Sequence, residues 1–249
     1  MFRPDALLRE WQVLAGLLRG MPRVSADASA SERLAAFYGP QAAHYDAFRE
    51  RLLHGRADLV AALQPPPGAQ VVELGGGTGR NLAFFPAARR ADLHLTVVDL
   101  CAPLLQQARE RLADWPNARV VEADATHWQP ESPVDCVFFS YALTMMDDWR
   151  GAIDNAIAML RPGGTLGVVD FHVSSATPDA GLQRHGFLTR RFWPYWFGHD
   201  GVHLGPERLD CLRAALPVHR LEERRVPVPY LPGLRVPIHV FVGTKPQAV

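Results

Sequence analysis

The chain has 249 residues, of which 48% are hydrophobic, and its 26 basic and 26 acidic side chains give a formal net charge of zero. This composition is typical of a globular protein with a full core and excludes a disordered or collagen-like chain. Because no long run of one charge occurs, no nucleic-acid partner is expected from bulk electrostatic attraction.

Residues 2–19 predict an amphipathic helix with four large apolar side chains on one face. Packing against the rest of the protein and lying in a membrane interface are both open to such a helix. A polar link follows, so residues 1–30 are assigned to this helix and link, and residues 31–249 to one domain. The four apolar residues are Leu7, Trp11, Leu14 and Leu18.

The first twenty positions contain several charged residues, so they lack the uncharged core of a signal peptide, and no run of about 18 apolar residues could span a bilayer. Cys101, Cys136 and Cys211 are odd in number and far apart, which indicates a reducing compartment. We therefore expect a cytoplasmic protein, with peripheral contact to the inner membrane face left open. No C-x-x-C or H-E-x-x-H spacing predicts a metal site.

Two helical segments precede the first strand. Ser29 and Glu32 form a plausible capping box for a helix that ends at Tyr38. A second helical run is predicted over residues 41–63.

The most informative stretch is Glu73 to Gly79, with the pattern E-x-G-x-G-x-G after an apolar run. The run predicts a buried parallel strand, and the glycines predict a turn into a helix near Arg80. Glycines at such a turn permit positive φ angles and leave no Cβ between the backbone and a nucleotide-like ligand. Arg80 stands where the dinucleotide fingerprint needs a small residue, and the Lys of a Walker loop is absent, so NAD and ATP are disfavoured.

This pattern resembles motif I of the class I S-adenosylmethionine-dependent methyltransferases. Asp99 strengthens the resemblance because it ends the next apolar run, where an acid can accept hydrogen bonds from both ribose hydroxyls. The alternative is that Glu73 and Asp99 only end two strands and bind no cofactor. The resemblance implies S-adenosylmethionine as cofactor, bound by Glu73, Gly75, Gly77, Gly79, Asp99, Leu100, Asp124, Ala125 and Ser140.

Strands and helices alternate through the middle of the chain, which predicts a mostly parallel, doubly wound α/β sheet, Rossmann-like, ending in an antiparallel hairpin. Chemistry-bearing residues follow the carboxyl ends of the predicted strands, where open α/β sheets bind ligands. Residues 172–206 interrupt the alternation with a dense aromatic insertion, which is either a small satellite core or a lid over an apolar acceptor. The predicted strands after the first are 93–98, 119–121, 134–139, 165–169, 218–222 and 236–242, with a helix over 149–160.

A closer resemblance covers the chain from about Tyr38 onward. The segment from Tyr45 and Asp46 to Arg56, the run Ser140 to Met146, the aromatic insertion and the proline-rich ending look like the bacterial betaine-lipid N-methyltransferases. That family converts diacylglycerylhomoserine to diacylglyceryl-N,N,N-trimethylhomoserine by three successive methylations.

This resemblance implies a lipid substrate with an amine headgroup and an upstream aminocarboxypropyl-transferase. His172 is then the candidate base that removes the amine proton, while Tyr141 and Tyr45 are candidates to orient the nitrogen. A phosphatidylethanolamine methyltransferase, a quinone-ring methyltransferase and a non-catalytic S-adenosylmethionine-binding module remain alternatives.

Overall fold

The computed structural model describes residues 29–39, 45–199, 201–229, 231 and 233–247. The predicted helix over residues 2–19 lies outside these ranges, so it stays a prediction. No helix in the described part of the chain is long and apolar enough to cross a bilayer.

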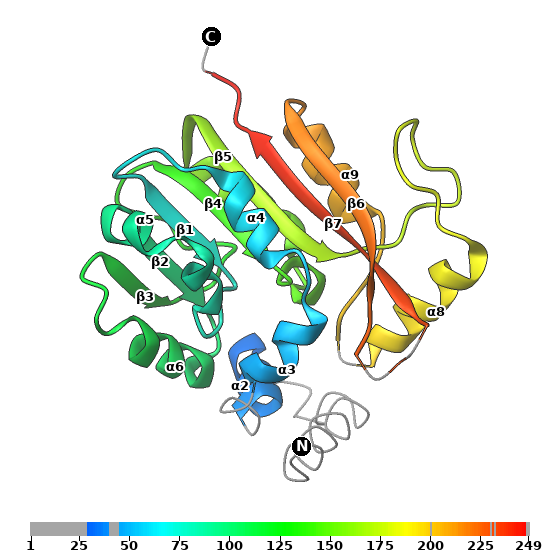
Figure 1. Cartoon of the computed structure of the whole chain (residues 1–249), viewed down its shortest axis with the longest axis horizontal. Helices are drawn as coiled ribbons and strands as arrows, with labels where there is room; N and C mark the ends of the chain where they lie inside the picture. The colour runs from blue at the N-terminus through cyan, green and yellow to red at the C-terminus, as the bar shows by residue number, and fades with distance from the viewer. Residues whose placement is uncertain (1–28, 40–44, 200, 230, 232, 248–249) are drawn as a thin grey trace.

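A seven-stranded sheet forms the centre of the molecule (Figure 1), and its strand order is β3-β2-β1-β4-β5-β7-β6. The first five strands run parallel, while β7 pairs antiparallel with both β5 and β6. The predicted α/β sheet with its antiparallel ending is thus confirmed. The strands are β1 (Gln70–Leu74), β2 (His94–Asp99), β3 (Ala118–Glu122), β4 (Val134–Ser140), β5 (Leu160–Phe171), β6 (His219–Pro227) and β7 (Arg235–Thr244).

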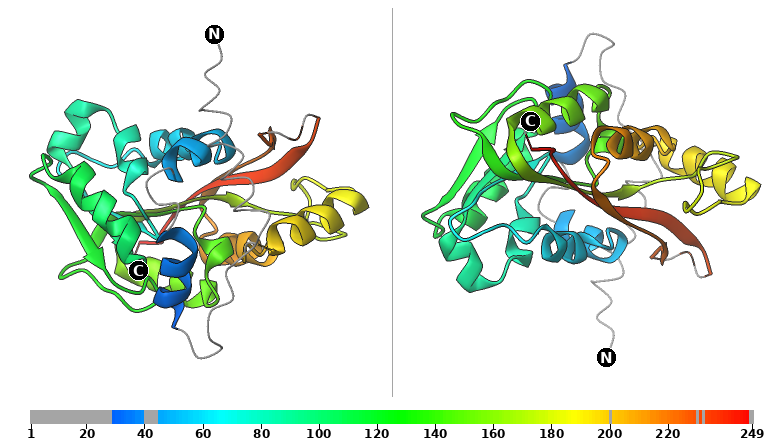
Figure 2. Two further views of the ribbon diagram at one scale, coloured as in Figure 1. Left: turned by 90° about the horizontal axis from the view of Figure 1, so that it is seen from below. Right: turned by 90° about the horizontal axis from the view of Figure 1, so that it is seen from above.

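Helices cover both faces of the sheet (Figure 2). Residues of α4, the 3₁₀ helix η2 and α6 pack with Val71 and Phe138 on one face, whereas residues of α7 and α9 pack with Val72 and Phe139 on the other. Neighbouring strand residues thus point to opposite faces, as the pleat requires. The helices are α2 (Ala30–Tyr38), α3 (Tyr45–Leu52), α4 (Arg56–Leu63), η2 (Arg80–Phe84), α5 (Ala87–Asp92), α6 (Ala102–Leu112), η3 (Leu143–Met145), α7 (Trp149–Met159), α8 (Phe187–Gly198) and α9 (Glu207–Ala215).

The N-terminal helices differ in part from expectation. The capping box is present, because the Ser29 side chain accepts from Glu32 N and the Glu32 carboxylate accepts from Ser29 N at 2.8 Å. The single run expected over residues 41–63 is instead two helices, separated at Gly55 with φ 82°. A Cβ on Gly55 would lie 3.1–3.3 Å from side-chain atoms of three neighbours, so both the positive φ and the close packing require glycine.

The helix expected after the glycine turn is present. It begins at Arg80 as the short 3₁₀ helix η2 and ends before Pro86. Proline lacks the backbone N–H that a continuing helix would use, and the residue before it avoids helical geometry.

Lys245, the only lysine in the chain, satisfies the carboxyl end of α7. Its Nζ donates to the backbone carbonyls of Ile157 at 2.8 Å and Leu160 at 2.6 Å. A cation at this end of a helix also interacts favourably with the helix dipole.

Candidate functional site

A cleft of about 460 Å³ lies at the carboxyl ends of the parallel strands. The helices α2 and α3 lie at the same end of the sheet (Figure 1) and contribute to its lining. A volume of this size is usual for a small-molecule site. Seven of the nine predicted cofactor residues line the cleft, namely Gly75, Gly77, Asp99, Leu100, Asp124, Ala125 and Ser140.

The glycine turn forms the floor of this cleft. Gly75 has φ +67°, and a Cβ there would approach the Cβ of Ala142 to 2.6 Å, so glycine lets the loop after β4 come close. Gly77 has φ +53°, and its N–H donates to Asp99 Oδ2 at 2.8 Å. Gly79 does not line the cleft: a Cβ there would touch Leu112 and Val97 at 3.4 Å, so its function is packing between α6 and the sheet.

Asp99 is held in one orientation by backbone donors. Its Oδ1 accepts from Cys101 N at 2.8 Å, and its Oδ2 accepts from Gly77 N. Burial raises the pKa of Asp99, although these hydrogen bonds act in the opposite direction. Each oxygen keeps a second lone pair, so the carboxylate can still accept hydrogen bonds from a ligand in the cleft.

Ser140 supplies an observation that points to a ligand. Its hydroxyl is buried, lines the cleft and has no hydrogen-bond partner in the described part of the chain. Buried polar groups in native proteins almost always have partners, so a polar group of a bound molecule belongs here. The glycine turn, Asp99 and Ser140 together fit a nucleoside cofactor.

Glu73 is a correction to the predicted cofactor set. Its side chain is fully buried and does not line the cleft, and it accepts a hydrogen bond from Asn81 Nδ2 at 2.6 Å. Burial raises the pKa of Glu73 to about 8. Glu73 lies on the same sheet face as Val71, beneath η2, because residues two apart in a strand share a face.

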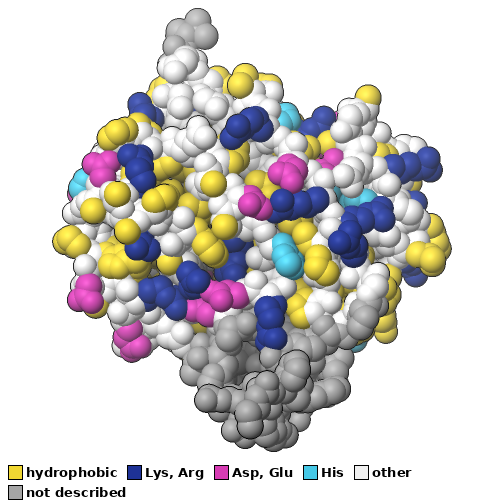
Figure 3. Space-filling model, in the orientation of Figure 1, with side chains coloured by type: hydrophobic (Ala, Val, Ile, Leu, Met, Phe, Trp, Pro, Cys, Tyr) yellow, Lys and Arg dark blue, Asp and Glu magenta, His cyan; other side chains and the backbone are white. Residues whose placement is uncertain are grey.

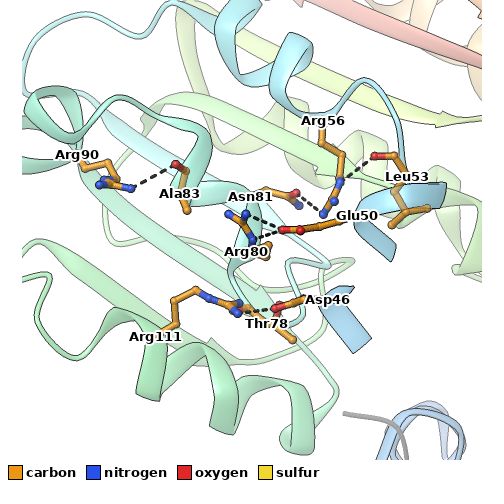
Figure 4. Close-up of polar contacts among 10 residues, drawn as sticks. All are labelled: Asp46, Glu50, Leu53, Arg56, Thr78, Arg80, Asn81, Ala83, Arg90 and Arg111. Carbon is orange, nitrogen blue, oxygen red and sulfur yellow. Dashed lines mark hydrogen bonds and ion pairs between the residues drawn. The ribbon is translucent and has the colours of Figure 1, made fainter. Parts of the chain in front are cut away.

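A polar network ties α3 and α4 to the glycine turn (Figure 4). Thr78 Oγ1 donates to Asp46 Oδ1 at 2.8 Å, and Arg111 pairs with the same carboxylate. Arg80 pairs with Glu50 at 2.6 Å. These contacts hold α3 over the cleft.

Arg56 is the most informative member of this network. Only 7% of it is exposed, and it lines the cleft. Its Nε donates to Leu53 O at 2.9 Å, and its Nη1 donates to Asn81 Oδ1 at 3.3 Å, but it forms no ion pair with any carboxylate among the described residues (Figure 4). Burial lowers its pKa, yet a guanidinium stays protonated in proteins. A buried, unpaired cation in a cleft is a site for an anionic group.

Tyr141 lines the cleft, as predicted, but its hydroxyl is already engaged. It has φ 55°, and its hydroxyl donates to His54 O at 2.6 Å. Burial raises the pKa of Tyr141 well above its usual value, so the phenol stays neutral. Tyr45 is the first residue of α3, and its side chain lies outside the described residues, so its proposed role stays a prediction.

His172 does not lie in the cleft, which corrects the expectation that it faces a bound acceptor. It lines a separate cavity of about 140 Å³, and its Nε2 lies 3.0 Å from Glu223 Oε1. Its ring is 5.1 Å from that of His185 and 5.3 Å from that of His239. His172 is therefore not placed to take a proton from a molecule bound at the glycine turn.

The comparison with protein families identifies the part of the chain that carries this cleft. Residues 71–164 match the family described as a methyltransferase domain. This segment is therefore similar to a methyltransferase domain. A solved structure of similar fold, phosphoethanolamine N-methyltransferase 2 of Haemonchus contortus, binds S-adenosyl-L-methionine and superposes with a TM-score of 0.62 at 15% identity.

Curated relatives match over part of their length. The chain is 30% identical over 124 residues to trans-aconitate 2-methyltransferase of Azoarcus sp. (strain BH72), covering 50% of this chain and 47% of that protein. It is 29% identical over 133 residues to demethylmenaquinone methyltransferase of Clavibacter sepedonicus, covering 53% and 51%. The chain thus spans about half the length of the curated relatives it matches.

Solved structures agree on the fold. The Haemonchus contortus enzyme in complex with phosphomonomethylethanolamine and S-adenosylhomocysteine superposes with a TM-score of 0.66 at 13% identity, covering 88% of this chain and 61% of that one. At this identity the likeness shows the fold of the methyltransferase domain alone.

Several residues at the methyltransferase cleft were not predicted as site residues. Asp46 and Arg56 were noted only within a family resemblance, and His203 only as part of the insertion. Gly201 and His203 line the cleft, and His203 N donates to Thr144 O at 2.7 Å. The insertion thus reaches the domain's cleft just after α8, and the sequence signal for this was the pair of histidines that follows its aromatic run.

Proposed function

We propose that this chain is an S-adenosylmethionine-dependent N-methyltransferase that converts the amine of diacylglycerylhomoserine to the trimethylated betaine lipid in three steps. The observation that carries this acceptor is Arg56, a buried cation in the cleft without a carboxylate partner among the described residues. The homoserine headgroup offers a carboxylate on the same carbon as the amine. An Arg fork that holds this carboxylate also fixes the position of the amine.

The cofactor residues of the proposal are those that line the cleft. Asp99 accepts from the ribose hydroxyls, Asp124 and Ala125 lie at the adenine, and Ser140 pairs with a polar group of the cofactor. When bound, S-adenosylmethionine supplies a methyl group activated by an adjacent sulfonium. The chain's own contribution is to align the amine with that methyl carbon and to exclude water.

The amine must be neutral before it can attack. Since His172 lies outside the cleft, the proton needs another acceptor, and His203 is the histidine that the insertion brings to the cleft lining. We assign the proton that leaves the nitrogen to the His203 imidazole. The nitrogen lone pair would then be free to take the methyl group that bound S-adenosylmethionine would supply, with S-adenosylhomocysteine as the second product.

The names of the curated relatives suggest two other methyl acceptors, trans-aconitate and a demethylmenaquinone. Trans-aconitate is also anionic, whereas a demethylmenaquinone offers no carboxylate to Arg56. Phosphatidylethanolamine combines an amine with a phosphate, which an Arg also recognises. These acceptors separate in a direct competition.

The test is mass spectrometry of products after incubation with S-adenosylmethionine and each of four acceptors: diacylglycerylhomoserine, phosphatidylethanolamine, a demethylquinone and trans-aconitate. Stepwise gain of three methyl groups on the homoserine lipid alone supports the proposal. Methylation of another acceptor refutes diacylglycerylhomoserine as the substrate. Cofactor binding without methylation of any of the four acceptors favours a non-catalytic binding module.

Arg56→Gln tests whether the guanidinium binds the carboxylate of the homoserine headgroup or the methionine carboxylate of the cofactor. If Arg56 binds the acceptor, KM for the homoserine lipid rises about 100-fold while affinity for S-adenosylhomocysteine is retained. A loss confined to S-adenosylhomocysteine affinity would instead assign Arg56 to the methionine carboxylate. Arg119→Gln is the control, since Arg119 is exposed and lies outside the cleft lining.

A further inference from the structure

The helix α8 carries large apolar side chains on the side that faces solvent. Phe187, Leu188 and Tyr195 are 69%, 79% and 74% exposed, and Phe192 is 37% exposed. With Arg191 they recur at helical spacing, so they form one outward strip, which we call the α8 face. Clustered exposure of this kind on a globular protein marks a contact surface.

The opposite side of α8 is anchored in the core. Trp193 and Phe197 are buried, and the Phe197 ring stacks on that of Phe171 at 4.7 Å. The core side of the helix therefore already has its apolar partners. Phe192 packs on Trp193 at 4.9 Å, so it belongs in part to that anchor. Phe187, Leu188 and Tyr195 make no ring contact with Trp193 or Phe197, and substituting these three leaves the anchor intact.

The charged side chains of α8 itself are arginines. Arg190 and Arg191 lie on the helix and Arg184 precedes it, while the nearest acids in the sequence are Asp179 and Asp200, outside the helix. Figure 3 shows hydrophobic side chains together with Lys and Arg at the edge of the molecule where Figure 1 places α8.

We propose that the α8 face docks on an anionic lipid bilayer. Its aromatic and aliphatic side chains enter the interfacial region, and its arginines meet the anionic headgroups, which is how interfacial helices bind. Tyrosine suits this depth because its ring is apolar and its hydroxyl stays hydrated. An anionic lipid bilayer matches both the apolar strip and the exposed Arg191 within it.

Docking of the α8 face would bring the cleft to the membrane that holds the proposed lipid substrate. This step rests on the proposed function. The helix ends at Gly198, and Gly201 and His203 just after it line the cleft. A lipid held at the α8 face therefore lies next to the cleft. Its headgroup can reach the cofactor while its acyl chains remain in the bilayer.

The test is sedimentation of the whole protein with phosphatidylcholine vesicles, prepared with and without phosphatidylglycerol and free of any amine acceptor. Wild-type protein is expected to bind the anionic vesicles, and binding is expected to weaken with salt. The triple variant Phe187→Ser, Leu188→Ser and Tyr195→Ser is expected to lower vesicle affinity about 100-fold, since three exposed apolar side chains no longer enter the interface. Arg184→Gln with Arg191→Gln is expected to remove the preference for phosphatidylglycerol.

Val218→Ser is the matched control. Val218 is 71% exposed but lies at the far end of the hairpin, where its carbonyl accepts from Thr244 N at 2.9 Å. This variant is expected to bind vesicles like wild type, and S-adenosylhomocysteine binding by calorimetry verifies that all variants are folded.

Three results would overturn the docking: no vesicle binding by wild type, undiminished binding by the triple variant, or a solution dimer that the triple variant dissociates. The last would assign the α8 face to a second copy. Because the vesicles contain no acceptor, failure here is separate from failure of the proposed methylation, which a short-chain, water-soluble homoserine lipid tests independently.

Discussion

Glu73→Gln is expected to remove a pH-dependent loss of stability. The Glu73 carboxyl is fully buried, and burial raises its pKa to about 8 from 4.5. Between these two values the unfolded chain releases the proton while the folded protein keeps it, so the free energy of unfolding falls as pH rises. The loss is about 1.4 kcal/mol for every pH unit, and it sums to about 4 kcal/mol between roughly pH 5 and pH 8.

Glutamine resembles the protonated carboxyl in shape and keeps an oxygen for the Asn81 amide, which now donates to Glu73 at 2.6 Å. The variant and the wild type are therefore expected to have similar stability near pH 5, and the variant is expected to be the more stable near pH 8.

Urea unfolding followed by circular dichroism across this range measures the difference, in which the contributions of all other groups cancel. Glu131→Gln, at a highly exposed carboxylate, is the control and is expected to leave the pH profile unchanged in shape. Parallel profiles for Glu73→Gln and wild type, or a variant less stable near pH 8, would refute a protonated Glu73.

Gly75→Ala is expected to lower the free energy of unfolding, measured in urea, by about 2 kcal/mol more than Gly68→Ala does. Both residues have positive φ, but only at Gly75 would the new Cβ meet a neighbour, at 2.6 Å. Equal losses would show that the loop after β4 moves to make room for the methyl group. His185→Gln is expected to make the free energy of unfolding less sensitive to acid. Burial lowers the His185 pKa to about 4, so the wild type loses about 3 kcal/mol of stability as pH falls from 6.5 to 4. The same loss in the variant would contradict this reasoning. His203→Ala is expected to lower kcat about 100-fold with S-adenosylhomocysteine affinity retained, and an unchanged kcat would remove His203 from the proton transfer.

The sheet could be predicted from the sequence because each parallel strand contains a short apolar run, and most of these runs are followed by an acid or a glycine. What the pattern could not reveal was the direction of single side chains. Glu73 follows the strand alternation of Val71 and points beneath η2, away from the ligand edge. The same alternation turns His172 toward Glu223, while Phe171 joins the core cluster that contains Tyr141.

Arg56 could not be placed from sequence for a different reason. A continuous helix over residues 41–63 would send its side chain in another direction than the observed break at Gly55 does. Whether a glycine interrupts a helix depends on its tertiary neighbours, here Val169 and Ile238, which come from distant strands. The glycine turn and the strand ends, by contrast, are local motifs, and seven of the nine residues predicted there line the cleft.

The strand order has a consequence for how the chain is made. β5 pairs with β7 and not with β6, although β6 is synthesised first. During translation the hydrogen-bonding edge of β5 therefore stays open while α8, α9 and β6 emerge, and only the last strand can close it. An open, apolar strand edge is a site for pairing with another chain. Slow translation through β6 would thus prolong the exposure of the β5 edge that β7 later covers, from Thr165 to Phe171.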